Sequence, residues 1–313
     1  MSETAKRGLR ILVTIPHFCK PDEKEGNKRR ELRSMSLVRS VSSFIQQAGD
    51  SQFCLDFTDK TTRYVNHAEQ QRCDLFICTT GDTHLLGELD ILKGLYNHVK
   101  TDARPLMLGY TCREILKSFL GKYDYYCYVE DDLFLNDPLF FQKLAWFTRE
   151  SGNGCLLQPN RCETSFSPYA KKCYIDGDIP PENNPHFNYD LGPLSFSSLG
   201  CDVMFTPASN PHSGCFFLNA EQFEHWVRQP HFNDWDISWL GPLESAASLG
   251  IMKTFNIYKP AWQNANFLEI NHFGDAYLQM IGEEFEPAVQ SPLSCLNPLQ
   301  LDPLTAKANG VSL

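Results

Sequence analysis

Three consecutive acids, Glu130, Asp131 and Asp132, are the residues of this sequence best placed to do chemistry. They directly follow the aromatic run YDYYCYV (123–129), whose composition is typical of a buried strand. Because alternate residues of a strand share a face, we expect Glu130 and Asp132 to point one way and Asp131 the other. With no Lys or Arg beside them, these acids either have raised carboxyl pKa values or recruit a hard cation.

The position of the acids suits a site, because ligands of open α/β sheets bind at the carboxyl ends of strands. Asn136-Asp137-Pro138 is expected to begin a helix, with Asp137 as its N-cap and Pro138 as its first residue. The acids would then lie on a short turn between strand and helix. A solvated acidic loop is the alternative. Of the two other Asp-x-Asp patterns, 176–178 is interpreted as a turn and 234–236 as an aromatic loop that could contact an acceptor.

Hydrophobic periodicity predicts the elements that hold this turn. Over the first 130 residues it alternates between short apolar runs and helical patterns, which is typical of a parallel sheet with crossover helices. The predicted strands there are 9–15, 74–80 and 123–129, and the predicted helices are 31–47 and 105–120. Past residue 150, short strands are expected at 171–175, 202–206 and 215–218, with helices at 220–229 and 243–249.

This pattern predicts one continuous α/β domain over residues 1–285, followed by a poorly packed extension over 286–313. The chain has 313 residues and a net charge of −10, and an acidic chain is a poor binder of nucleic acid. Its twelve cysteines are scattered without a CxxC motif, so we expect reduced thiols rather than disulfides or zinc. No signal peptide or membrane span is recognisable, which predicts a cytoplasmic protein without an integral membrane segment.

Taken in order, these pieces resemble the GT-A-fold, family-2-like glycosyltransferases that use nucleotide sugars. The acidic triplet looks like an EDD form of their metal-binding DxD motif and is similar to that of the Golgi N-acetylglucosaminyltransferases. Four further residues resemble family positions, and they are Arg113 in YTCREILKSFL, Gly214 in HSGCFF, Glu244 in GPLESAASLG and His272 in EINHFG. The resemblance covers roughly residues 9 to 275 and implies a GT-A-like (Rossmann-like), mostly parallel central sheet flanked by helices, with a more irregular acceptor half.

The resemblance also implies roles for these residues. Asp132 would ligate Mn²⁺ or Mg²⁺ directly, and His272 would complete the metal shell. Glu130 would either ligate the metal through a water molecule or bind the donor ribose. Arg113, Gly214 and Asp131 would join Glu130 in binding the donor. Glu244 would act as the catalytic base, although Leu243 precedes a single Glu where the family usually has an acidic pair. In a retaining enzyme no such base is needed, and Glu244 would only position substrate.

The resemblance therefore implies a metal-dependent glycosyltransferase that moves a sugar from a nucleotide-diphosphate sugar, with a UDP-sugar as the expected donor, to a carbohydrate or other hydroxyl acceptor. Residues 1–132 would bind the donor and 133–285 the acceptor. One alternative is a nucleotidyltransferase that synthesises sugar nucleotides. Such enzymes usually carry a Gly-rich, basic loop after the first strand, where this chain has PHFCKPDEKEG. The other alternative is a non-catalytic carbohydrate-binding protein on the same fold.

Overall fold

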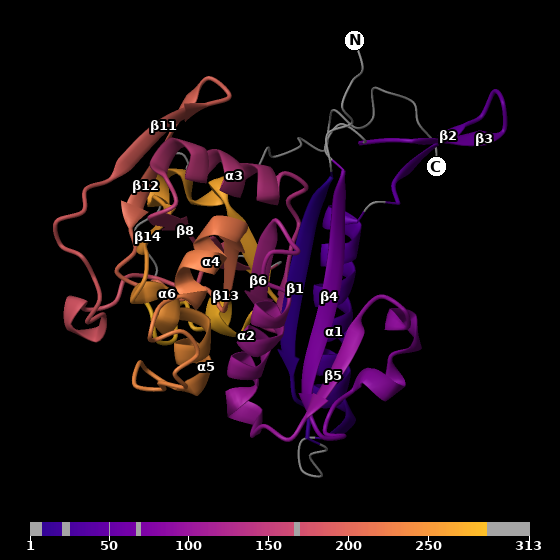
Figure 1. Ribbon diagram of the computed structural model, residues 1–313, viewed down its shortest axis with the longest axis horizontal. Helices are drawn as coiled ribbons and strands as arrows, with labels where there is room; N and C mark the ends of the chain where they lie inside the picture. Colours follow the sequence, from indigo (N-terminus) through magenta and orange to yellow (C-terminus); the bar gives the residue numbers. More distant parts are fainter. Residues whose placement is uncertain (1–7, 21–25, 50, 67–69, 166–169, 287–313) are drawn as a thin grey trace, which may run out of the picture.

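The computed structural model describes residues 8–20, 26–49, 51–66, 70–165 and 170–286 (Figure 1). The predicted C-terminal extension therefore lies outside the described residues, apart from Glu286. The strands of the first half are β1 (Leu9–His17), β2 (Phe53–Asp56), β3 (Thr61–Tyr64), β4 (Gln71–Thr80), β5 (Asn97–Thr101), β6 (Tyr125–Val129) and β7 (Leu133–Phe134). Those of the second half are β8 (Cys155–Leu157), β9 (Asn160–Thr164), β10 (Lys172–Tyr174), β11 (Leu194–Ser198), β12 (Cys201–Pro207), β13 (Cys215–Asn219), β14 (Asn256–Pro260) and β15 (Glu269–His272).

The α-helices are α1 (Gly26–Ala48), α2 (Leu108–Ser118), α3 (Phe140–Ser151), α4 (Ala220–Val227), α5 (Pro242–Glu244), α6 (Gly250–Met252) and α7 (Ala276–Gln279). A π-helix over Ser245–Leu249 joins α5 to α6, so residues 242–252 form one helical segment. The strands and helices predicted from periodicity are present, with ends that differ by a few residues. The helix expected at Pro138 begins at Phe140 instead, because the Asp137 carboxylate accepts the N–H of Leu139 in a preceding turn.

Five strands form the central sheet, in the order β13-β6-β1-β4-β5. β6, β1, β4 and β5 run parallel, and β13 pairs antiparallel with β6 at one edge. β1 pairs with β4 along its whole length, from Leu9 opposite Gln71 to His17 opposite Thr79. Since β1 and β6 are parallel neighbours, the acids that follow β6 lie beside the end of β1.

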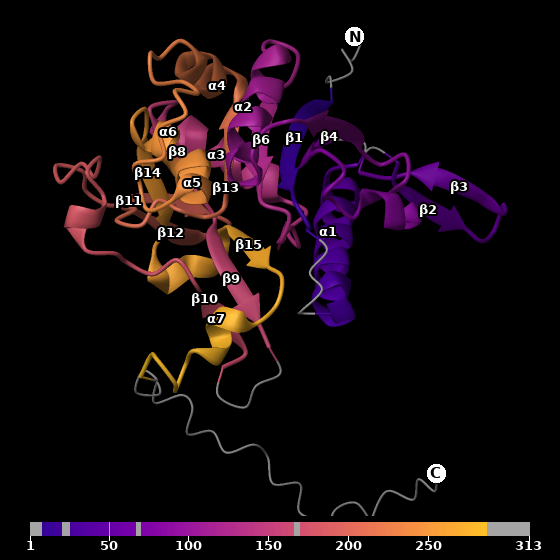
Figure 2. The ribbon, with the colours of Figure 1, turned by 90° about the horizontal axis from the view of Figure 1, so that it is seen from below.

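Alternate residues of the central strands enter two hydrophobic cores, one on each face of the sheet. On one face, Ile11, Val13 and Ile15 of β1 pack against buried residues of α1 and α3. On the other face, Leu12 packs with residues of α2, α4 and the 242–252 segment. Figure 2 shows α1 and α2 on opposite sides of the sheet. The near-continuous apolar runs in the sequence reflect strands that are buried on both faces.

The second half of the chain builds two smaller sheets, β10-β9-β15-β7 and β11-β12-β14-β8. Each mixes parallel and antiparallel pairs. The predicted α/β class is confirmed. The described sheets taken together are mixed rather than mostly parallel, because β13 is antiparallel in the central sheet and both smaller sheets contain antiparallel pairs. A parallel pair needs a long crossover, whereas the two-residue turn at Leu199-Gly200, with positive φ at both positions, can only join antiparallel strands.

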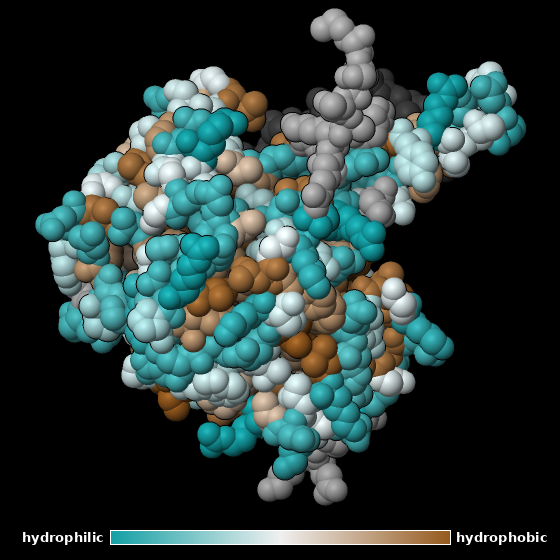
Figure 3. All heavy atoms as spheres, in the orientation of Figure 1, coloured by the Kyte–Doolittle hydropathy of each residue, from teal (hydrophilic) through white to brown (hydrophobic). Residues whose placement is uncertain are grey.

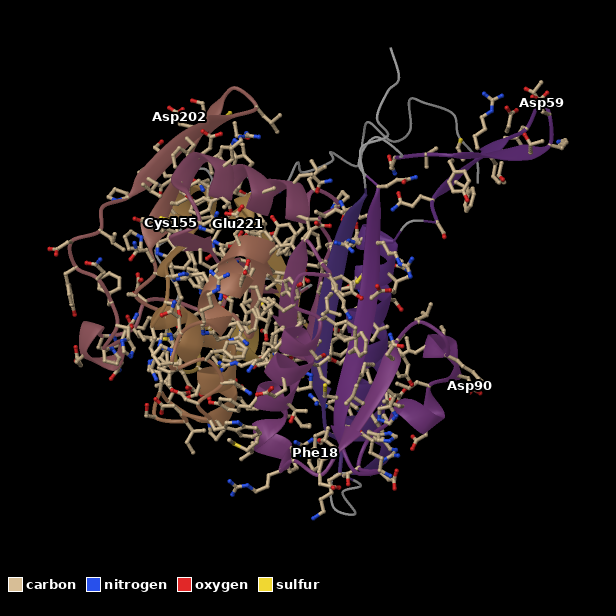
Figure 4. All side chains as sticks on the ribbon, viewed as in Figure 1. Phe18, Asp59, Asp90, Cys155, Asp202 and Glu221 are labelled. Carbon is tan, nitrogen blue, oxygen red and sulfur yellow. The ribbon has the colours of Figure 1, made fainter. Side chains whose placement is uncertain are left out.

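The hairpin β2–β3 projects from the body of the molecule, with Asp59 near its tip (Figure 4). It forms a separate two-stranded sheet that the sequence analysis missed. Its exposed apolar side chains include Phe53, Leu55 and Phe57. On the face shown in Figure 3, the rest of the surface is mainly hydrophilic, with hydrophobic residues in separate patches.

The cysteines and helices of the described residues bear on two further expectations. Every cysteine in this part of the chain is a free thiol. Among the same residues, no helix is both long enough and apolar enough to cross a bilayer.

The 242–252 segment packs closely on α4 at Gly250, and this contact yields a stability prediction. A Cβ at Gly250 would lie 2.5 Å from Cζ2 of Trp226, a fully buried ring that has no room to move. Gly250→Ala should therefore lower the free energy of unfolding by about 1–3 kcal/mol, the usual cost of overpacking. Urea denaturation measures the change. Gly154→Ala, where no atom lies within 4 Å of the new Cβ, is the control and should change it by less than about 0.5 kcal/mol.

Candidate active site

A cleft of about 230 Å³ opens at the carboxyl ends of β1 and β6. Phe18, labelled at the lower end of the sheet in Figure 4, contributes to one wall. Its described lining consists of Pro16, Phe18, Arg33, Pro105, Leu106, Leu108, Tyr128, Glu130, Asp131, Asp132 and Leu243. The three predicted acids thus share one cleft with apolar walls, and Arg33 is the one cation among these lining residues.

Asp131 is held by groups of the protein itself. His17 Nδ1 lies 2.5 Å from one carboxylate oxygen, and Arg33 donates to both oxygens at 2.7 and 3.0 Å. His17 Nε2 accepts the N–H of Leu85, which leaves its proton on Nδ1, facing Asp131. The Ser36 hydroxyl also donates to the Asp131 carbonyl. Asp131 therefore ties the acidic turn to β1 and α1, and this role was not foreseen when it was predicted to bind donor.

Glu130 points in another direction, toward Gly214. Its N–H donates to the Gly214 carbonyl at 3.0 Å. Gly214 has φ of +62°, and a Cβ there would lie 2.5 Å from Glu130 Oε2. The family resemblance implied that Gly214 contacts the donor. In the structure, the Glu130 carboxylate occupies that space.

Burial and the charge of Asp132 together raise the pKa of the Glu130 carboxyl to about 8, against the opposing effect of Arg161. Arg161 Nη1 lies 3.7 Å from Glu130 Oε2. The charge of Glu244 also raises this pKa. Near neutral pH, Glu130 is therefore protonated to a much larger extent than an ordinary surface glutamate.

Arg161 belongs to a buried ionic network that the sequence analysis missed. Its Nη2 donates to Asp176 Oδ1 at 2.7 Å, and Lys259 Nζ lies 3.7 Å from Asp176 Oδ2. Burial opposes ionisation of Asp176, but Lys259 and Arg161 outweigh it and lower the pKa of this carboxyl. The 176–178 pattern was interpreted as an ordinary turn, and that interpretation was wrong for Asp176, which is 5% exposed. A charged residue inside a strand, such as Arg161, was the available signal.

Asp132 and His272 face each other across β7 and β15. Asp132 Oδ2 lies 3.6 Å from His272 Nε2, and Asp132 Oδ1 is buried without a hydrogen-bond partner in the described structure. Behind the ring, His272 Nδ1 lies 2.8 Å from Glu163 Oε1. Burial disfavours the charged ring, but the two flanking carboxylates outweigh it and raise the pKa of His272 to about 9.

Asp132 and His272 are the described residues that could supply two ligands to a divalent cation at this position. Among the described residues, no three His, Cys, Asp or Glu side chains are grouped to hold a metal by themselves. Asp132 offers an unpartnered carboxylate oxygen, and His272 offers an imidazole nitrogen once a metal displaces the proton of Nε2, while Glu130 turns away toward Arg161. Mg²⁺-type sites commonly use one or two protein ligands, with substrate phosphates and water completing the shell.

Glu244 lies half-buried in the first turn of the 242–252 segment, directly after the cleft residue Leu243. A Cβ at Gly241 would lie 2.7 Å from Glu244 Oε2, so the side chain folds back over the glycine. The structure thus places Glu244 next to a residue of the cleft that Glu130 lines.

Arg113 is not brought to the cleft. It is 1% exposed and donates to the carbonyls of Ser245 and Ala246, at 3.0 and 2.5 Å. Its guanidinium also lies over the rings of Tyr110 and Trp226. Since a π-helix does not form the usual i→i−4 hydrogen bonds, Arg113 supplies donors to carbonyls of this helix. The structure therefore gives Arg113 a role in the core, and the predicted contact with donor phosphate is not available to it in this position.

A larger hollow, of about 530 Å³, lies where β4 begins, at the opposite end of the sheet from the acids. Its described lining is uncharged and rich in amides, and includes Gln46, Gln52, Asn66 and Gln71. It presents no group for proton transfer or metal binding, so the smaller cleft is the candidate active site.

Comparison with known proteins gives fold-level similarities. No family model matches the sequence, and no curated protein matches it. Among solved structures, the chain is similar to S. aureus TarS, with 7% identity and a TM-score of 0.41, over 86% of this chain and 37% of that one. It is also similar to a Bacillus anthracis structure described as a glucose-1-phosphate thymidylyltransferase, with 9% identity and a TM-score of 0.35, over 80% and 87% of the two chains. A third is CMP:2-keto-3-deoxy-manno-octonic acid synthetase with CTP, with 10% identity and a TM-score of 0.36, over 87% and 96%.

All three TM-scores lie below 0.5, so the function is argued from the geometry of the cleft. The chain covers only about a third of TarS, 37% of its length.

The Arg161–Asp176 pair yields a prediction about stability. Arg161→Met removes the main partner of a buried carboxylate and should lower the free energy of unfolding by about 3–5 kcal/mol. Adding Asp176→Leu should recover part of that loss, because a buried Asp176 carboxylate is then no longer left without Arg161, while Lys259 and Glu130 still lose their ion-pair partners. A double-mutant cycle in urea measures the coupling. Arg149→Met, which removes the exposed Arg149–Glu150 pair, should cost at most about 1 kcal/mol. Additive losses would contradict the assignment.

Proposed function

We propose that this chain is a metal-dependent glycosyltransferase with a GT-A-like fold, acting on a nucleotide-diphosphate sugar. The observation that carries the proposal is the arrangement of Asp132 and His272. An unpartnered carboxylate oxygen and a supported imidazole lie together at the carboxyl edge of a parallel sheet, beside a cleft with apolar walls. This combination suits a ligand with a ring to stack and a diphosphate to neutralise.

Asp132 and His272 would hold Mn²⁺ or Mg²⁺, which as a Lewis acid stabilises the negative charge that develops on a departing diphosphate. Arg33 adds a second positive charge, since it lines the cleft with about a third of its side chain, 32%, exposed. Phe18 and Leu106 offer apolar surfaces for a nucleobase. Arg33 would bind the diphosphate while its hydrogen bonds to Asp131 keep it in place.

Glu244 is the proposed base. In an inverting reaction its carboxylate would accept the proton of the acceptor hydroxyl as the oxygen attacks the anomeric carbon and the bond to the diphosphate breaks. In a retaining reaction it would position substrate only. Glu130 is a less suitable base, because its carboxylate lies against Gly214 and its raised pKa reduces the ionised fraction.

A ligand screen and a product assay test the proposal together. The screen follows the unfolding temperature with UDP-, GDP-, CMP- and dTDP-sugars, with and without Mn²⁺. A donor at 100 times its dissociation constant should add about 2.7 kcal/mol of stability. Release of nucleoside diphosphate, or of CMP from a CMP-sugar, would identify a glycosyltransferase, with a UDP-sugar as the expected donor. Release of pyrophosphate from a nucleoside triphosphate and a sugar phosphate would identify a nucleotidyltransferase. Binding without either product would identify a carbohydrate-binding protein.

Asp132→Ala tests the metal site. It should abolish the Mn²⁺-dependent part of donor binding, a larger loss than the roughly 10–100-fold caused by removing a supporting residue. The fold should persist, because the alanine leaves no unpaired buried oxygen. Calorimetric titration of the donor, with and without Mn²⁺, measures the effect. Asp178→Ala, an exposed acid outside the cleft, is the control. Unchanged Mn²⁺-dependent binding in Asp132→Ala would remove the assignment.

Glu244→Gln separates chemistry from binding. Glutamine keeps the size of the side chain but cannot accept a proton as a base, so kcat should fall by about 10²–10⁴-fold. Donor affinity should stay near the wild-type value, because Asp132 and His272 are untouched. Steady-state kinetics with a donor-binding control measure both. A fall in kcat of less than about threefold would show that Glu244 is not a general base.

A further inference from the structure

Glu163 is a fully buried carboxylate that lies directly behind His272. Its side chain has 0% exposure, and each of its oxygens has a partner. Oε1 lies 2.8 Å from His272 Nδ1, and Oε2 accepts the N–H of Leu278 at 2.8 Å. Burial opposes its charge, but the hydrogen bonds from His272 and the backbone outweigh it and lower the pKa of this carboxyl. With both oxygens engaged, the carboxylate is fixed in orientation.

Strand register places Glu163 behind the imidazole. β15 lies between β7 and β9 in their sheet. On one side His272 pairs with Leu133, the residue after Asp132, and Phe273 donates its N–H to the Asp132 carbonyl. On the other side Asn271 pairs in parallel with Cys162, so Glu163 is the next residue along. Asp132, His272 and Glu163 therefore form a row across three neighbouring chain segments.

We propose that Glu163 is a positioning residue, which holds the His272 ring so that Nε2 faces the metal position beside Asp132. The inference rests on the proposed function. A carboxylate that accepts from Nδ1–H fixes the tautomer and the ring plane, and increases the basicity of Nε2. Tyr277 packs edge-on against the same ring, with 5.7 Å between the ring centroids. The ring is therefore held from behind by Glu163 and from the side by α7.

Glu163 also anchors α7 through the Leu278 N–H, so a purely structural role must be separated from positioning. Leu278→Ala offers that separation. Leu278 is 4% exposed, and its truncation should loosen the packing of α7. The substitution keeps the backbone N–H and leaves the Glu163–His272 contact intact. A loss that comes only from a loosened α7 would therefore appear equally in Leu278→Ala and in Glu163→Gln.

The experiment measures Mn²⁺ affinity in the presence of UDP, from the EPR signal of free Mn²⁺, for wild type, Glu163→Gln, Leu278→Ala and His272→Ala. Glu163→Gln should weaken Mn²⁺ binding by about 10–100-fold, and Leu278→Ala should weaken it much less. Pulsed EPR of bound Mn²⁺ should show coupling to a histidine nitrogen in wild type. This coupling should be absent in His272→Ala and altered in Glu163→Gln. Circular dichroism checks that each variant is folded.

Three outcomes would overturn the inference. If Glu163→Gln binds Mn²⁺ like wild type with the same nitrogen coupling, Glu163 does not position His272, and the proposed function stands. If Leu278→Ala matches the loss in Glu163→Gln, the role of Glu163 is structural. If wild type itself binds no Mn²⁺ with UDP, the proposed metal site and the inference fall together. Should Glu163→Gln not fold, Glu163→Asp replaces it. It keeps the charge but shortens the reach, and its Mn²⁺ affinity should also fall below that of wild type.

Discussion

The repulsion among three adjacent carboxylates is the constraint on which the candidate site depends. Glu130, Asp131 and Asp132 would destabilise the fold if all three faced one another with their charges unpaired. The structure directs each to a different partner: Glu130 toward Arg161, Asp131 toward Arg33 and His17, and Asp132 toward His272. These different partners decide which of the three carboxylates remains available to bind a ligand. Of these three acids, Asp132 alone keeps a buried oxygen with no hydrogen-bond partner in the described structure.

The same constraint explains why so much charge lies beneath the cleft. Arg161 compensates Glu130 but is itself buried, so it needs Asp176, and Lys259 then lies next to Asp176. Burying these charges has a desolvation cost. Substituting one member of the network should therefore lower the stability of the fold more than replacing all of its members with apolar residues. Its placement under the acids gives it a use beyond stability, because it fixes where the Glu130 carboxylate lies.

The chemistry proposed for this chain follows from the different roles of the residues around the acidic turn. Asp132 and His272 present a carboxylate and an imidazole toward one position, and Glu163 holds the imidazole from behind. Arg33 and Glu244 flank the cleft with opposite charges, suited to a phosphate and to a hydroxyl proton respectively. A metal shared between protein and diphosphate requires few protein ligands, which agrees with a site of two such groups.

The sequence by itself determined the α/β class, the strands β1, β4 and β6, and the position of the acidic turn, because apolar runs and helical periods report burial locally. It also singled out Asp132 and His272 through their resemblance to a family motif. Tertiary structure alone decided the partners. Arg161 and Glu130 are 31 positions apart, and Glu163 and His272 are 109 apart, yet both pairs meet. Hydrophobic periodicity does not identify a polar residue whose burial depends on a residue far away in the sequence. The roles of Arg113 and Gly214 were equally unreadable from the sequence. Arg113 donates hydrogen bonds to carbonyls of the 242–252 segment, and Gly214 leaves room for the Glu130 carboxylate. Both contacts exist only in the packed chain.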